Sequence, residues 1–373
     1  MLPALRWTRE RWPIAVPVVA LLVLAGGALA HDHWSELTVM AVALIGGIVA
    51  AVHHAEVVAH KVGEPFGSLI LAVAVTVIEV GLIVMLMTSG GAGISTYARD
   101  TVFAAVMITL NGIVGLSLLA GALKHNLVSF NAAGTGSAVA TVIALAGVTL
   151  VLPSFTTSGA GLEYSPSQLA FAAVVSLGLY GAFVFTQTIR HRDFFLPVAS
   201  DERGRAIGLL DLDKDGHPDP PEARQAWLSL GLLVGALVAV VGLAKLVSPT
   251  IEDVVKDLEL PYGVVGVVIA LLILAPESIA AVRNAARNRV QLSLNLAYGS
   301  AMASIGLTIP AVAVAMIWLT GPLELGLEPT QMVLFLLTVV ITAFTILQGR
   351  AYALQGVVHL TLFAAFLFFS VQP

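Results

Sequence analysis

Residues 66–88 read FGSLILAVAVTVIEVGLIVMLMT, and residues 262–282 read YGVVGVVIALLILAPESIAAV. Each segment is long and apolar enough for a membrane-spanning helix, which needs about 20 mainly apolar residues. Each also carries one acidic residue near its middle, Glu79 in the first and Glu277 in the second. An acidic side chain at the centre of a bilayer costs about 2.5–3.5 kcal/mol on insertion scales, so its presence there indicates a function.

The composition of the whole chain is typical of the same class of protein. Of its 373 residues, 58% are hydrophobic and 11% are charged, and the mean hydropathy is +0.94. A soluble protein has about a quarter of its residues charged, so we predict a polytopic protein whose partner is the lipid bilayer. The 18 Lys and Arg residues form no basic stripe, which excludes nucleic-acid binding. The absence of cysteine excludes disulfides and thiolate metal sites.

Eleven apolar stretches follow one another along the chain, and they lack the alternating pattern of a membrane β-barrel. We therefore predict an all-α fold of about 11 transmembrane helices. The predicted spans are 13–30, 35–59, 66–88, 101–122, 135–153, 168–189, 226–247, 262–282, 292–318, 330–348 and 352–371.

Basic residues predict the orientation of these spans. With the N-terminus in the cytoplasm of a bacterial cell and the spans in its inner membrane, all but three of the 18 basic residues lie on the cytoplasmic side. The three on the outer side are Arg99, Lys245 and Lys256. The first span also resembles a cleavable signal peptide that ends at Ala28-Leu29-Ala30, and this alternative stays open.

The ten spans after the first divide into two sets of five. Because five is odd, the second set enters the membrane from the side opposite to the first, which predicts an inverted repeat. Glu79 and Glu277 then occupy equivalent second helices and meet at the bilayer centre; the alternative is that each is a protonated side chain that only ties helices together. The predicted segments are an extra N-terminal helix at 1–34, a first repeat at 35–190, a cytosolic connector at 191–225 and a second repeat at 226–373.

Two groups of motifs surround these acidic residues and resemble the α-repeats of the calcium/cation antiporter superfamily, in particular its ChaA-type branch. The resemblance implies alternating-access exchange of a cation for protons, with Glu79 and Glu277 as shared ligands. It also implies ligands on the third helix of each repeat, at Asn111, Ser300 and Ser304. The motifs are Gly63-Glu64-Pro65-Phe66-Gly67-Ser68-Leu69-Ile70-Leu71, Ile78-Glu79-Val80, Pro276-Glu277-Ser278, Arg283-Asn284-Ala285-Ala286-Arg287-Asn288 and Gly299-Ser300-Ala301.

Charge then predicts the mechanism. Two carboxylates at low dielectric cannot both stay ionised unless one Ca²⁺ or two protons neutralise them, so competition for the pair couples the two fluxes. We predict Ca²⁺/H⁺ exchange; a Na⁺(K⁺)/H⁺ antiporter of the same fold is the alternative, and a passive cation channel is a remote one. Met107 and Ala275-Pro276 replace oxygen ligands that relatives carry, which favours the alternative.

No catalytic motif for an enzyme occurs. The patterns H-E-x-x-H, G-x-S-x-G and the P-loop are absent from the sequence, so neither an intramembrane hydrolase nor an ATP-driven pump is predicted. We expect no cofactor other than the transported ions and a regulatory Ca²⁺, and the oligomeric state stays open.

Histidines form two further features. His53, Glu56 and His60 share one helix face near the cytoplasmic end of the second span, where they provide proton or cation access or are simply an interfacial polar face. His359 stands alone in the last span, and we expect it to form a hydrogen bond between helices.

The connector contains D-L-D-K-D-G at 211–216, which fits the spacing of an EF-hand calcium loop. The alternative is a solvated acidic linker that leads into a helix. The candidate ligands of a regulatory Ca²⁺ are Asp211, Asp213, Asp215, His217, Asp219 and Glu222.

Overall fold

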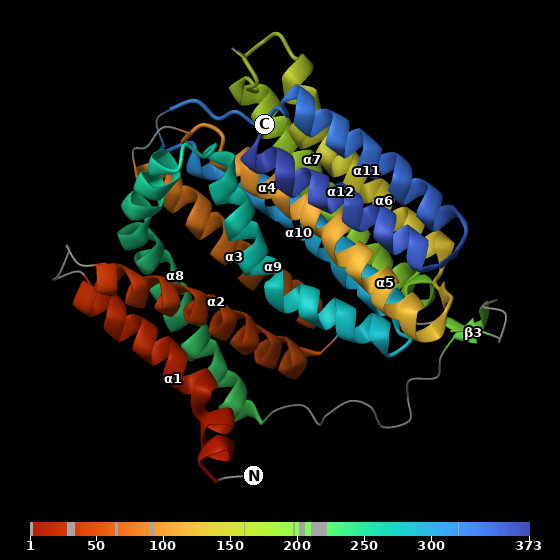
Figure 1. Cartoon of the computed structure of the whole chain (residues 1–373), viewed down its shortest axis with the longest axis horizontal. Coiled ribbons are helices and arrows are strands. Elements are labelled where there is room, and N and C mark those ends of the chain that lie inside the picture. Colours follow the sequence, from red (N-terminus) through yellow and green to blue (C-terminus); the bar gives the residue numbers. More distant parts are fainter. Residues whose placement is uncertain are drawn as a thin grey trace. The chain divides into compact units, whose positions relative to one another are not determined.

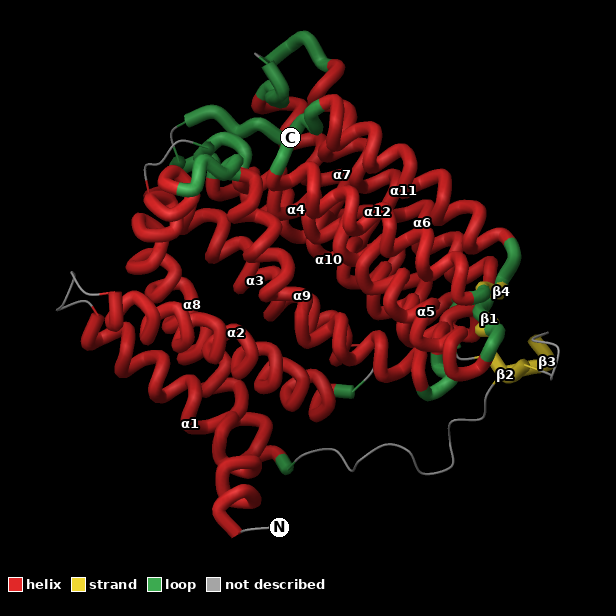
Figure 2. The backbone as a smooth tube through the Cα atoms, viewed as in Figure 1, coloured by secondary structure: helices red, strands yellow, loops and turns green. Residues whose placement is uncertain are grey.

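The computed structural model describes residues 3–27, 34–63, 66–89, 93–159, 161–196, 198–200, 206–209, 222–319 and 321–373, most of which are helical (Figure 1, Figure 2). In chain order the elements are α1 (Pro3–Gly27), α2 (Trp34–Val62), α3 (Phe66–Ser89), α4 (Tyr97–Met107), η1 (Ile108–Ile113), α5 (Val114–His125), β1 (Val128–Ser129), α6 (Ala132–Ala146), η2 (Gly147–Val151), η3 (Leu152–Phe155), α7 (Pro166–Phe185), η4 (Thr186–Arg190), η5 (Arg192–Phe195), β2 (Val198–Ser200), β3 (Ala206–Leu209), α8 (Ala223–Asp257), α9 (Gly263–Ala286), α10 (Val290–Ala315), α11 (Pro329–Leu347), β4 (Arg350–Ala351) and α12 (Ala353–Val371).

The predicted spans agree with the helices. Among the described residues, 10 helical stretches are long and apolar enough to cross a membrane, and they coincide with the last ten predicted spans. The apolar part of α1, Trp12–Gly27, coincides with the first. The main difference is α8, which continues to Asp257 beyond the predicted end at residue 247. Pro249 removes a backbone donor inside α8, but the remaining hydrogen bonds carry the helix through it.

Contacts divide the chain into two compact units, and both units draw on both predicted repeats. Unit 1 comprises Met1–Ile94 and Pro218–Glu259, and unit 2 comprises Ser95–His217 and Leu260–Pro373. In unit 1, α8 packs along α2, and α1 and α3 both contact this pair (Figure 1).

A hydrogen bond from a side chain of α2 to a backbone carbonyl of α1 holds the two helices together. Pro17 lacks an N–H group, so the carbonyl of Pro13 has no donor within its own helix. The Nε2 atom of His54, on α2, lies 2.8 Å from this carbonyl oxygen and satisfies it. His54 is only 3% exposed, and the neighbouring ring of His53 lies 5.2 Å from that of Trp12. The first helix is therefore an integrated part of unit 1.

The continuous helical stretch α4–η1–α5 forms the centre of unit 2. Of its most apolar window, 89% is buried, compared with 17% for α12 and 22% for α7. α9 and α10 pack against this stretch from one side, and α12 packs against α5 and η1. An antiparallel pairing of β1 with β4 connects the end of α5 to the turn between α11 and α12 (Figure 2). The outer helices keep exposed apolar faces, which suits contact with lipid.

Glycines set the distance between α12 and α5. A Cβ atom added to Gly356 would lie 2.6 Å from the backbone nitrogen of Leu119 and 2.9 Å from the carbonyl oxygen of Gly115. A Cβ atom added to Gly115 would lie 3.1 Å from the Cβ of His359. Small residues at both positions allow the two backbones to approach closely, as membrane helices often do.

Replacement of Gly356 by alanine is therefore expected to destabilise unit 2. The new methyl group meets backbone atoms that cannot move aside, and such overpacking costs about 1–3 kcal/mol. Gly178→Ala on α7 is the matched control, because nothing lies within 4 Å of its added Cβ. Thermal unfolding in detergent measures both variants. An unchanged melting temperature for Gly356→Ala would show that α12 does not pack as described.

Candidate functional site

Glu277 lies in a helical hairpin formed by α9 and α10. The turn between the two helices contains Asn288 with a φ of 62°, a left-handed conformation that asparagine adopts more readily than most residues. The backbone nitrogens of Arg287 and Arg289 both donate to the carbonyl of Asn284, which closes the end of α9. This tight turn lays α10 against α9, so side chains at the middle of the two helices face each other.

Glu277 and Ser300 meet across this hairpin. Glu277 lies in α9 and is 9% exposed, and the hydroxyl group of Ser300 in α10 donates to its Oε2 atom at 2.5 Å. Pro276 precedes Glu277 inside the helix and removes the donor that would bond the Leu272 carbonyl. The carboxylate of Glu277 and the hydroxyl of Ser300 thus meet between the two helices, and the Leu272 carbonyl, which lacks its helical donor, belongs to a residue five positions before Glu277. These are oxygen ligands of the kind that hard cations bind.

Asn111 lies on η1, a π-helical segment within the buried centre of unit 2. π-helical turns are rare and occur often at functional sites. η1 contacts α9 and α10, the helices of Glu277 and Ser300, and also α11 and α12. Asn111 is fully buried, and its Nδ2 atom donates to the hydroxyl oxygen of Thr338 at 2.9 Å. The sulfur of Met107 packs on the same amide at 3.8 Å.

The predicted ligands are divided between the two units. Glu277, Ser300, Ser304 and Asn111 belong to unit 2, and Ser304 is 5% exposed one turn beyond Ser300. Glu79 lies on α3 in unit 1 and is 4% exposed. Of these residues, a described side-chain hydrogen bond joins Glu277 and Ser300 directly. The assignment of all five as ligands stays a prediction.

The predicted access residues lie on α2 in unit 1. His53 is partly buried beside Trp12, whereas Glu56 and His60 are exposed. The spacing therefore places two of the three side chains on an accessible part of the helix.

The candidate EF-hand loop lies almost entirely outside the described residues. Glu222 is the exception; it immediately precedes α8 and is exposed. Regulatory Ca²⁺ binding stays a prediction. Outside the described residues lie Asp211, Asp213, Asp215, His217 and Asp219.

His359 forms a hydrogen bond between helices, as predicted, and its partner belongs to a row of threonines that the sequence analysis did not single out. Its Nε2 lies 3.1 Å from the hydroxyl oxygen of Thr345 on α11, and its Nδ1 lies 3.4 Å from Oδ1 of Asn111. The expected hydrogen bond between helices is therefore present. Thr338, Thr342 and Thr345 recur at helical spacing in an otherwise apolar span and are all buried. That spacing is the signal that would have identified this polar face.

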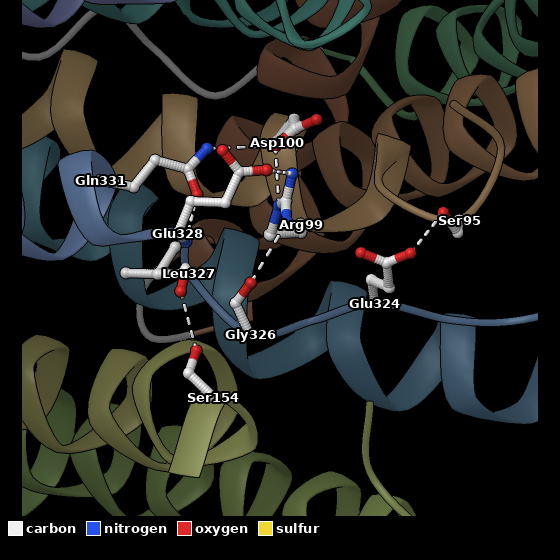
Figure 3. A network of polar contacts seen from close by, with 9 residues as sticks. All are labelled: Ser95, Arg99, Asp100, Ser154, Glu324, Gly326, Leu327, Glu328 and Gln331. Atoms are coloured by element: carbon white, nitrogen blue, oxygen red, sulfur yellow. Dashed lines mark hydrogen bonds and ion pairs between the residues drawn. The ribbon is translucent and has the colours of Figure 1, made fainter. Parts of the chain in front are cut away.

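A second polar network lies where α4 begins (Figure 3). Arg99 and Asp100 are 3% and 5% exposed, and Nε of Arg99 lies 2.9 Å from Oδ1 of Asp100. Arg99 also donates to the carbonyl of Gly326 at 3.3 Å and pairs with Glu328 at 3.1 Å. Gln331 at the start of α11 donates to Asp100 at 3.2 Å.

This network binds the segment before α11 to the start of α4. Ser154 donates to the carbonyl of Leu327 at 2.8 Å, and Ser95 donates to Glu324 at 3.0 Å (Figure 3). Segments from both predicted repeats are thereby joined within unit 2. Arg99, assigned above to the outer side, is thus a buried structural cation.

The sodium/calcium exchanger protein family model matches residues 33–189 and 228–372. The chain belongs to this family. It is a cation/proton antiporter of the calcium/cation antiporter superfamily, as the α-repeat motifs predicted, and a multi-pass membrane protein. The family consists of transporters and not of catalytic enzymes.

Relatives match over nearly the whole chain. The putative ionic transporter y4hA of Sinorhizobium fredii is 43% identical over 97% of this chain and 96% of its own length. The sodium-potassium/proton antiporter ChaA of Escherichia coli is 32% identical over 98% of this chain and 97% of its own length. In fold, the chain resembles native YfkE, with a TM-score of 0.70 at 16% identity over 97% of this chain and 100% of that one. It also resembles the H⁺/Ca²⁺ exchanger CAX, with a TM-score of 0.68 at 16% identity over 96% and 88%.

Removal of the Arg99 guanidinium is expected to destabilise the protein strongly. Arg99→Met leaves Asp100 buried without its counter-charge, and breaking a buried pair in this way costs about 3–5 kcal/mol. Neutralising the partner as well, in Arg99→Met/Asp100→Asn, is expected to restore part of the loss. Thermal unfolding in detergent measures the effect, with exposed Arg350→Met as the control. Equal melting temperatures for Arg99→Met and the control would contradict the network.

Proposed function

We propose that the protein exchanges Ca²⁺ for protons by alternating access, with the cation and the protons competing for Glu79 and Glu277. The observation that carries this proposal is the buried pair of Glu277 and Ser300 on facing helices. Ser304 and Asn111 are proposed as further oxygen ligands, because they lie on α10 and η1, elements that contact each other. Glu79 is the equivalent buried acid of the first repeat.

Charge balance favours a divalent cation at two carboxylates. Two ionised carboxylates carry two negative charges, which one Ca²⁺ or two protons neutralise, whereas binding both would leave an excess positive charge. A site that alternates between these two occupied states exchanges one Ca²⁺ for two protons. The protons titrate with the pair of carboxylates and not with either one alone.

Na⁺(K⁺)/H⁺ exchange is the second candidate. It is favoured by the 32% identity to the sodium-potassium/proton antiporter of Escherichia coli over 98% of this chain. Met107 at the first-repeat ligand position also offers a soft sulfur where an oxygen would suit Ca²⁺ better. With a monovalent cation, one proton must stay on the carboxylate pair to complete its neutralisation.

For the membrane setting, we propose the bacterial inner membrane with the N-terminus in the cytoplasm, as the basic residues indicate. In this orientation α2 ends at the cytoplasmic side. Exposed Glu56 and His60, with His53, then provide the route by which protons or cations reach the site.

Replacement of either acid by glutamine is expected to abolish exchange. Glutamine keeps the size of glutamate but cannot bind a proton or neutralise a cation. The assay uses acid-loaded proteoliposomes with an internal pH dye, to which Ca²⁺, Na⁺ and K⁺ are added in turn. Glu79→Gln and Glu277→Gln are compared with exposed Glu259→Gln as the matched control.

The wild type and the control should dissipate the proton gradient with one cation, which names the transported ion. Cation entry without proton movement, insensitive to both glutamate substitutions, would overturn the antiport mechanism in favour of a channel.

Ser300→Ala removes a hydrogen bond to a charged group worth about 1.5–3 kcal/mol. If that bond is made more strongly in the cation-bound state, the KM for the cation changes while the maximal rate is retained.

We also propose that the connector binds a regulatory Ca²⁺ through the loop that ends at Glu222. Its acidic residues fit the EF-hand spacing, in which a Gly at the sixth position allows the sharp turn. Isothermal titration of a peptide of residues 200–226 is expected to show Ca²⁺ binding that Asp211→Asn/Asp213→Asn removes. The absence of binding heat would show that the connector is a solvated acidic linker and not a Ca²⁺ site.

A further inference from the structure

Where α11 and α12 meet η1, four buried polar side chains lie in contact with one another. Asn111, Thr338 and His359 are each 0% exposed, and Thr345 is 5% exposed. No acidic side chain hydrogen-bonds to this cluster among the bonds described for unit 2. The polar atoms of the cluster therefore have to be satisfied by hydrogen bonds between neutral groups, because an unpaired buried charge would be costly.

The hydroxyl group of Thr338 determines which way the Asn111 amide faces. This hydroxyl donates its single hydrogen to the carbonyl of Leu334 at 2.8 Å, so it can only accept from Asn111. The amide nitrogen of Asn111 must then face Thr338, at 2.9 Å. The amide oxygen consequently faces the other way, where Nδ1 of His359 lies 3.4 Å from it.

The amide oxygen of Asn111 determines the proton on His359. This oxygen can only accept a hydrogen bond, whereas a hydroxyl can donate or accept, so Nδ1, which faces the oxygen, carries the hydrogen. Nε2 is then an acceptor, so the hydroxyl of Thr345, 3.1 Å away, gives its hydrogen to Nε2. In this arrangement it does not donate to the carbonyl of Ile341, which lies 2.9 Å from the same hydroxyl and remains the acceptor of a backbone N–H within α11. The imidazole is then neutral, with both nitrogens hydrogen-bonded and no buried charge.

Close packing fixes the imidazole at this place. Gly356 lies one turn before His359 on α12, and Gly115 lies one turn after Asn111 on the central helix. At these two glycines the backbones of α12 and α5 approach closely, as the added Cβ distances above show. The backbone thus holds the ring against the amide, and little freedom is left for either side chain.

We propose that His359 is a positioning residue for cation binding. Its Nδ1–H holds one lone pair of the Asn111 oxygen while Thr338 holds the amide nitrogen, so the carboxamide offers the other lone pair of its oxygen, and not its N–H group, to the cation. The inference rests on the proposed function, because it takes Asn111 as a ligand. Groups that orient a metal ligand in this way typically contribute about 10-fold to 100-fold to metal affinity.

The test compares replacements that keep or lose the donor at Nδ1. The amide nitrogen of asparagine occupies nearly the place of Nδ1, whereas that of glutamine occupies the place of Nε2. In proteoliposomes assayed with Ca²⁺, Na⁺ and K⁺, His359→Leu and His359→Gln are expected to raise the KM for the transported cation about 10-fold or more. His359→Asn is expected to restore a KM near that of the wild type, and the maximal rate should change less than KM in all three.

A second buried hydrogen bond provides the control for a merely structural effect. The hydroxyl of Ser293 on α10 donates to that of Ser117 on α5 at 2.6 Å, and both residues are fully buried. Ser293→Ala removes a bond between helices without touching Asn111, so its KM should stay at the wild-type value. If Ser293→Ala raises KM as much as His359→Leu does, the effect is general loosening and the proposal is overturned.

A double-substitution cycle separates this inference from the proposed function. If His359 acts through Asn111, His359→Leu adds nothing to the KM of Asn111→Ala. An increase in KM for Asn111→Ala with none for His359→Leu would overturn the role of His359 and leave the ligand assignment intact. An unchanged KM for Asn111→Ala, with exchange abolished by Glu277→Gln, would overturn the inference while antiport at Glu277 stands.

Discussion

The carboxylate of Glu277 lies in an apolar helix where little water reaches it, and the hydroxyl group of Ser300 donates to one of its oxygens. A buried carboxylate is stable only if hydrogen bonds, a cation or a proton balance its charge. A neutral hydroxyl such as that of Ser300 stabilises a carboxylate without cancelling its charge. In the proposed mechanism, a cation and protons take turns in cancelling this charge, which connects the packing of α9 and α10 to transport.

Two other sets of buried polar groups in the described part of the chain are paired within the protein. The Pro13 carbonyl, left without a donor by Pro17, is satisfied by His54. Arg99 finds Asp100 beside it and backbone or carboxylate oxygens around it. Outside the site, polar groups in lipid must be satisfied internally, since no water is available. These groups hold the fold, whereas Glu277 is the group proposed to bind the transported ion.

Much of the fold follows from the sequence because apolar length and charge placement are sufficient to define spans in a membrane. The Glu277 motif was equally evident, since an acid in an apolar run has few structural explanations. The direct partner of Asn111 was less evident: Thr338 lies 227 positions away along the chain, and only tertiary packing brings the two together. The spacing of the threonines in α11, which the sequence analysis did not use, predicts a polar face but not the partner of that face. The predicted span ends at residue 247, where the apolar run stops, whereas α8 continues through Pro249 to Asp257. One missing backbone donor does not end a helix that packs along its length.

The π-helical segment η1 explains how one buried helix serves two sides of unit 2. A π turn places one extra residue in the helical repeat, so side chains before and after it face directions that a regular α-helix would not combine. α4 can then pack its backbone closely on α9, where an added Cβ at Gly266 would lie 2.8 Å from the nitrogen of Thr101. α5 beyond the segment meets α12 through Gly115 and Gly356. Asn111 lies within η1, where the direction of the side chains changes. From this position Asn111 reaches α12, while η1 itself also contacts α9 and α10, the helices of Glu277 and Ser300.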